Sequence, residues 1–228
     1  MKIKNLMVAT ATFMLFATNT SSQTNPNFEF KNKVREEIGS VKKVNKFENE
    51  DLEKTAHVRF LHQDYKKAYI SKSTEVYNLR YNIYTDEMEY VNNENIYNLN
   101  KSENKIIDFF EIKASYGVFN LDDKLNYLLI KNSGKNSVLI KQIVEFDEGK
   151  KAVSQFDVKI APKFYRKKDL IYIAFNNTTL KSVPKKNKSF YKLFEDKATL
   201  IKKYMSKQKL SHKKIDDLVK IITYYNSL

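Results

Sequence analysis

Residues 75–91 read EVYNLRYNIYTDEMEYV, and this stretch decides the fold class. Apolar side chains occupy alternate positions in its first half, at Tyr77, Leu79, Tyr81 and Ile83. Polar residues stand between them, as is typical of a strand with one buried face. Thr85 and Asp86 predict a tight loop, after which residues 87–91 return as a second strand. The stretch therefore predicts a β-hairpin.

The same alternation suggests a register for this hairpin. If the loop is two residues long, Tyr81 lies opposite Tyr90 and Asn82 lies opposite Glu89. Arg80 is then a diagonal neighbour of Glu89 on the other face. This register places every apolar side chain of the two strands on one face of the hairpin.

Short apolar segments separated by polar turns continue on both sides of the hairpin. We expect further strands within residues 55–60, 68–70, 96–99, 105–112, 116–119, 125–130, 138–146, 152–160, 164–166, 170–175 and 179–183. Turn clusters such as Asn132-Ser133-Gly134 separate them. The pattern predicts a mainly antiparallel β meander, as a sandwich or a partial barrel, and disfavours alternating βαβ units.

The apolar period changes towards the C-terminus. Residues 189–206 and 211–226 each carry one apolar stripe at helical spacing, and Ser211 is a candidate N-cap. The short link between them predicts an αα-hairpin packed on the sheet. The expected fold class is therefore α+β. Residues 52–228 are expected to form one β-rich domain after a polar arm at 23–51.

Residues 1–22 have the layout of a secretory signal peptide. Two lysines precede an apolar run from Leu6 to Ala17, and small polar residues follow as far as Ser22. The run has 12 residues, which is short of the roughly 20 that a spanning helix needs. We therefore expect cleavage, export to the periplasm or the cell exterior, and a soluble product without a membrane span.

The composition limits the possible partners. Without cysteine the chain has no disulfide and no lipid-modified cysteine, so we do not expect a lipoprotein. The formal net charge is +14, yet only four of the 41 basic residues are arginine, the side chain that best recognises phosphate. Abundant lysine also follows from a nucleotide-composition bias. The positive charge alone is therefore best interpreted as lysines on a solvated surface, and no specific nucleic-acid partner is expected.

The segment from Leu79 to Tyr90 carries a motif of the form L-R-Y-N-x-Y-x-D-x-M-E-[YF]. With this motif the chain resembles a family of exported envelope proteins of Gram-negative bacteria, which also have a C-terminal two-helix tail. The similarity extends to residues 162–164, 185–186 and 224–226, and thus to most of the chain after the signal peptide. The resemblance implies export, but the family brings no known activity, cofactor or catalytic residue.

Arg80, Asp86, Glu87 and Glu89 form the densest charged cluster on the predicted hairpin. Paired carboxylates beside an arginine are suited to acid–base chemistry or glycoside hydrolysis. A cross-strand ion pair and a turn-capping aspartate would produce the same cluster. We favour this structural interpretation, and a hydrolase around Arg80 and Glu89 remains the alternative.

Other catalytic patterns give no candidate. The spacing of His57 and His62 fits no metal site, and His212, just past the N-cap of the last predicted helix, is expected to be exposed. The chain has neither a G-x-S-x-G nucleophile motif nor a phosphate-binding loop. We therefore predict no catalytic residue, no metal ligand and no cofactor.

Two lysine-rich segments are candidates for a polyanion-binding surface: the bend 163–168 and the run 181–192. Our leading prediction is a non-catalytic exported protein that acts by binding or structural association, with an envelope protein or a polysaccharide as its partner. The candidate binding residues are Arg80, Asp86, Glu89, Lys167 and Lys168.

Overall fold

The structure, a computed structural model, describes residues 38–41, 50–71, 73–92, 95–152 and 156–228. The chain divides into two compact units, residues 1–35 and residues 36–228. The first unit, with the predicted signal peptide, lies outside the described residues, as does most of the predicted polar arm.

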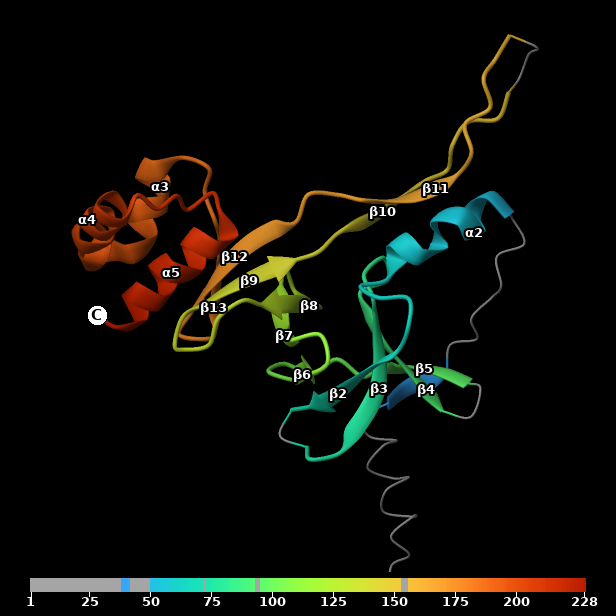
Figure 1. The fold of residues 1–228 in the computed structure, drawn as a ribbon, viewed down its shortest axis with the longest axis horizontal. Coiled ribbons are helices and arrows are strands. Elements are labelled where there is room, and N and C mark those ends of the chain that lie inside the picture. The colour runs from blue at the N-terminus through green and yellow to red at the C-terminus, as the bar shows by residue number, and fades with distance from the viewer. Residues whose placement is uncertain (1–37, 42–49, 72, 93–94, 153–155) are drawn as a thin grey trace, which may run out of the picture. The chain divides into compact units, whose positions relative to one another are not determined.

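Eleven described strands form one antiparallel sheet (Figure 1). In chain order they are β1 (Ile38–Val41), β2 (Lys66–Ile70), β3 (Val76–Asn82), β4 (Glu87–Asn92), β5 (Asn95–Leu99), β6 (Ile106–Phe109), β7 (Ala114–Leu121), β8 (Lys124–Ile130), β9 (Ser137–Lys141), β12 (Leu170–Phe175) and β13 (Thr179–Ser182). Their order across the sheet is β1-β5-β4-β3-β2-β6-β7-β8-β9-β12-β13, so most neighbours in space are also neighbours in the chain. The predicted, mainly antiparallel β meander is confirmed.

The sheet is curled, as contacts between side chains from strands that are far apart in its order show. The ring centroid of Tyr81 on β3 lies 4.9 Å from that of Tyr116 on β7 and 5.7 Å from that of Tyr127 on β8. Two strands, β2 and β6, separate β3 from β7 in the sheet. All three rings are buried, so they form part of a core inside the curl.

The β3–β4 hairpin has a four-residue loop where two residues were predicted. Arg80 therefore lies directly opposite Glu89, and each predicted pair is wrong by two residues. Pairing of the two strands ends at Asn82 and Glu87. The loop begins there because the side-chain oxygen of Asn82 accepts a hydrogen bond from the backbone N–H of Thr85, at 3.3 Å. Asp86 completes the loop in the left-handed conformation, with φ 55°. A shift of two residues preserves the faces, so the predicted apolar face is the buried one.

A separate two-stranded ribbon is formed by β10 (Val144–Asp147) and β11 (Lys163–Arg166). The single strand predicted at 138–146 is in fact two strands, since β9 pairs within the large sheet and β10 pairs with β11. The strand predicted at 152–160 is wrong for the residues described there, which carry one isolated bridge, from Ile160 to Lys150.

Helical structure replaces the strand predicted at 55–60. The helix α2 (Glu50–Ala56) is followed by the 3-10 helix η1 (His57–Arg59). Arg59 Nε donates a hydrogen bond to the carbonyl of Ala56 at 3.1 Å, which stabilises this turn. The hydroxyl of Thr55 accepts a hydrogen bond from the backbone N–H of Phe164 at 3.0 Å and so connects α2 to the ribbon.

The C-terminal region is helical, as predicted, but its first helix is interrupted. It consists of α3 (Asn187–Tyr191), the 3-10 segment η2 (Lys192–Lys197), α4 (Ala198–Gln208) and α5 (Ile215–Asn226). Glu195 breaks the helical path with φ 47° and ψ −116°. The last helix begins four residues after the predicted N-cap Ser211.

Apolar residues of these helices pack on β9 and β12 in one buried cluster: Val138, Ile173, Phe175, Phe190, Phe194, Ile201, Met205, Leu218, Ile221 and Ile222. The helical stripes are therefore buried against the sheet, as their spacing indicated. No helix among the described residues has the length and apolar character needed to cross a membrane.

Candidate functional site

Arg80 and Glu89, the most conspicuous pair in the sequence, form a buried ion pair between β3 and β4. Arg80 Nη2 and Nε donate to Glu89 Oε2 at 2.7 and 3.1 Å. Asn82 Nδ2 donates to Oε1 at 2.9 Å, and the hydroxyl of Tyr65 donates to Oε2 at 3.4 Å. Glu89 is only 6% exposed, and both of its carboxylate oxygens are occupied.

The guanidinium of Arg80 is enclosed as well. It lies over the rings of Phe60 and Tyr65, at 3.9 and 4.5 Å from their centroids, and Nη1 donates to the carbonyl of Gln63 at 3.0 Å. Burial raises the pKa of the Tyr65 hydroxyl to about 12, with Arg80 opposing this effect. A reactant would have to displace these partners, so the pair is built as a structural contact.

Asp86 lies apart from this pair and connects the hairpin loop to strands on the other side of the curl. It accepts hydrogen bonds from the Tyr81 hydroxyl at 2.6 Å and from Lys101 Nζ at 2.8 Å. It also forms an ion pair with Lys141 on β9 and lies 3.4 Å from the backbone N–H of Tyr127 on β8. Burial lowers the pKa of Lys141, and the neighbouring Asp86 opposes that shift.

Lys167, the residue after β11, forms an ion pair with a residue of the ribbon. Its ammonium pairs with the carboxylate of Glu145, which also accepts a hydrogen bond from the Tyr165 hydroxyl at 2.7 Å. These two hydrogen bonds lower the pKa of Glu145. The charge of Lys167 is therefore already neutralised by Glu145, which is not the case for Lys168.

Lys168 lines a cavity of about 440 Å³, which we call the lysine-lined cavity. Lys185 and Lys213 line the same cavity. They come from the segment before β12, the segment after β13 and the segment before α5, so the fold joins the two lysine-rich stretches of the sequence. Lys213 was not among the predicted candidates, because only the fold brings it to the other two.

The charge of the lysine-lined cavity is unbalanced. None of its three ammonium groups forms an ion pair with a carboxylate of the described residues. Asp169 is the acidic residue in the lining, so three lysines stand against one carboxyl group. Burial raises the pKa of Asp169, and the nearby Arg166 opposes that shift. Leu170, Ile171 and Val183 add an apolar wall.

His212 supports one side of this cavity and is buried, so the prediction that it is exposed is wrong. Its ring stacks on Phe190 with centroids 4.3 Å apart, and Nε2 donates to the carbonyl of Pro184 at 3.0 Å. Burial lowers the pKa of His212 and thus favours the neutral ring. His212 therefore holds the backbone at Pro184 beside the backbone of Lys213.

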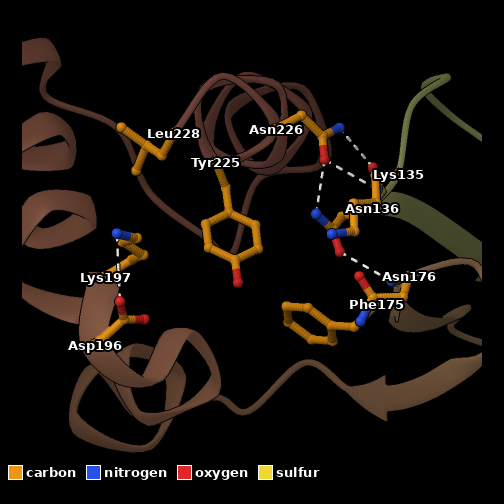
Figure 2. A pocket seen from close by; sticks show the side chains of 9 residues that line it. All are labelled: Lys135, Asn136, Phe175, Asn176, Asp196, Lys197, Tyr225, Asn226 and Leu228. Atoms are coloured by element: carbon orange, nitrogen blue, oxygen red, sulfur yellow. Dashed lines mark hydrogen bonds and ion pairs between the residues drawn. The ribbon is translucent and has the colours of Figure 1, made fainter.

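A second cavity, of about 270 Å³, lies between the end of α5, the β8–β9 turn and η2 (Figure 2). Asn226 Oδ1 accepts hydrogen bonds from the backbone and the side chain of Asn136, at 2.9 and 2.8 Å. Lys197 forms an ion pair with Asp196 at 3.3 Å. Most of the polar groups that Figure 2 draws are thus bonded to each other, which is typical of side chains that hold neighbouring segments of a fold together.

Comparisons with known proteins give no identification. No protein-family model, no curated protein and no solved structure matches the chain. Within the described part of the chain, no group of three or more histidine, aspartate or glutamate side chains is placed to hold a metal ion.

Proposed function

We propose that this chain is a non-catalytic binding protein of the cell envelope and that the lysine-lined cavity is its ligand site. The ligand is an anion with an apolar body. One observation carries this proposal: three lysines from distant parts of the sequence line one cavity together with an apolar wall.

The chemistry of the cavity fits such a ligand. Lysine ammonium groups act as point charges, which suit a carboxylate, sulfate or phosphate head group without strict geometry. Leu170, Ile171 and Val183 provide contact for a short apolar body. A volume of about 440 Å³ lies in the range of small-molecule sites.

The surrounding structure supports a site of fixed shape. We propose that α4 and α5 act as one αα-hairpin, because the rings of Tyr204 and Tyr224 stack with centroids 4.0 Å apart. Buried Met205 and Leu218 lie in the same cluster. Such a hairpin would hold Lys213 in place through His212. The predicted signal peptide and the resemblance to exported envelope proteins support the cellular location.

The alternative of a hydrolase at Arg80 and Glu89 has weaker support. A general acid or base must reach a substrate, and the Glu89 oxygens already accept hydrogen bonds from Arg80, Asn82 and Tyr65. The crevice beside Arg80 has no volume for a water-sized molecule. The lysine-lined cavity offers both space and unpaired charge.

Isothermal titration calorimetry with three probes tests the proposal: decanoate, acetate and decanol. Decanoate has both the charge and the apolar body, acetate has only the charge, and decanol has only the body. We expect wild type to bind decanoate more tightly than either of the others. The variant Lys168→Gln/Lys185→Gln/Lys213→Gln should bind decanoate at least about tenfold more weakly.

A matched control replaces three exposed lysines outside this cavity, in Lys124→Gln/Lys203→Gln/Lys207→Gln. It has the same net charge as the test variant and should bind decanoate as wild type does. If both variants bind equally, the site lies elsewhere. If decanol binds as tightly as decanoate, the lysines do not select the ligand.

A further inference from the structure

The outer part of the β10–β11 ribbon forms a second, independent surface. Beyond β10 and β11, the backbones of Lys150 and Ile160 exchange two hydrogen bonds, each of 2.8 Å. We call the described residues 150–152 and 156–160 the ribbon tip. The base of the ribbon is anchored, because Phe164 is buried against Phe146 and Tyr84. The ribbon tip thus extends from a fixed base.

Gly149 shapes the start of the ribbon tip. Its φ is +72°, and a Cβ at this position would lie 2.2 Å from the carbonyl oxygen of Ile160. The opposite strand can approach this closely only because residue 149 has no side chain. The bend between Asp147 and Lys150 therefore depends on the glycine at position 149.

Apolar side chains of the ribbon tip are exposed to an unusual degree. Phe156 is 87% exposed, Val158 is 78% exposed and Ile160 is 49% exposed. The three lie within five consecutive residues at the outer end of the ribbon, so the apolar exposure is concentrated in one short segment. Several exposed apolar side chains close together, unlike a single one, indicate a surface that binds another molecule.

The charges of the ribbon tip indicate what is bound. Lys150, Lys151 and Lys159 are exposed, whereas the acidic residue among residues 150–163 is Asp157. Amphipathic helices that lie in a bilayer interface combine phenylalanine and aliphatic side chains with lysines, and the ribbon tip exposes the same types of side chain. Lysines add affinity for anionic lipid head groups, whereas they repel a second copy of the same surface.

We infer that the ribbon tip docks on a lipid surface that contains anionic head groups. Phe156 and Val158 enter the interfacial region, and the exposed Lys150 and Lys151 contact lipid phosphates. This inference does not depend on the lysine-lined cavity, which is formed by other segments of the chain.

The absence of tryptophan from the sequence allows a local test. The variant Phe156→Trp places a single fluorescent reporter at the ribbon tip. The matched control, Leu200→Trp, places it at a 41% exposed position on α4. Both are titrated as full chains with phosphatidylcholine vesicles, with or without phosphatidylglycerol. A reporter at position 156 responds to its own surroundings, which separates tip binding from vesicle insertion of residues 6–17.

We expect the emission of F156W to shift to shorter wavelength with phosphatidylglycerol vesicles and much less with phosphatidylcholine alone. The emission of L200W should stay unchanged. Adding Val158→Ser to F156W should raise the lipid concentration at half-maximal shift by about tenfold. An unchanged F156W emission, an equal shift in L200W, or self-association without any response to vesicles would overturn the inference.

Discussion

The Arg80–Glu89 pair and the lysine-lined cavity are both charged, but they differ in how that charge is neutralised. On the hairpin, Glu89 accepts hydrogen bonds from Arg80, Asn82 and Tyr65. In the cavity, three lysines line a space, and among the described residues no carboxylate is paired with any of them. A dense charged motif can thus be scaffold, while scattered lysines can converge on a surface with binding capacity.

The largest effect expected is the loss of stability in Glu89→Ala. Removing the carboxylate leaves the largely buried guanidinium of Arg80 without a counter-charge, so the free energy of unfolding should fall by about 3 kcal/mol in chemical denaturation. Replacing both partners, in Arg80→Met/Glu89→Leu, should cost clearly less. A stable Glu89→Ala variant that no longer binds decanoate would reverse the comparison and make the hairpin a binding surface.

Asp86→Asn should cost about 2 kcal/mol, because the charged hydrogen bonds from Lys101 and Lys141 are weakened inside the curl. Asparagine tolerates the left-handed backbone, so the loss reports the charge. The control is Asp123→Asn, an exposed loop aspartate with φ 60°, which should change stability little. Equal stabilities of the two variants in thermal denaturation would show that the contacts of Asp86 are not stabilising.

Acidification should have a smaller effect through His212. Its pKa in the folded state is lowered from 6.5, so below that pH the unfolded chain takes up a proton that the folded protein resists. The free energy of unfolding should therefore decrease as the pH falls from about 7.5 towards 5. In His212→Gln, denaturation curves across this range should lose that component. An unchanged pH profile in the variant would contradict the assignment.

The smallest effect on stability is expected in Lys168→Gln/Lys185→Gln/Lys213→Gln. These side chains are exposed and have no carboxylate partner, so the free energy of unfolding should stay within about 0.5 kcal/mol of wild type. Denaturation of this variant beside Glu89→Ala measures the difference between the two regions directly. A large destabilisation by the triple substitution would show that the lysines also support the fold.

Local patterns were sufficient to predict most strands of the meander and the buried face of β3. They did not predict the loop of the β3–β4 hairpin, because a side-chain hydrogen bond from Thr85 to Asn82 closes the turn early. They also missed α2 and η1, because Ala56, Val58 and the following Phe60 alternate with polar residues as they would in a strand. The break at Glu195 lies inside an apolar stripe that continues unchanged on both sides.

The candidate site was predicted only in part. Lys168 was selected from a lysine-rich segment, but its neighbours Lys185 and Lys213 come from segments that meet only in the folded chain. The exposure predicted for His212 was wrong, because stacking on Phe190 is a tertiary contact. Arg80, Glu89 and Asp86 were recognised as a cluster, but the sequence could not show that Asp86 faces Lys141 instead.

The position of Asp86 has a consequence for the order of folding. Its partners Tyr127 and Lys141 lie 41 and 55 residues further along the chain, so these contacts require a large loop to close. We expect the local β3–β4 hairpin to form early and the curl to close late. Weakening the Asp86 contacts should then accelerate unfolding while leaving the refolding rate almost unchanged. The lifetime of the native state, more than its formation, would depend on this one carboxylate.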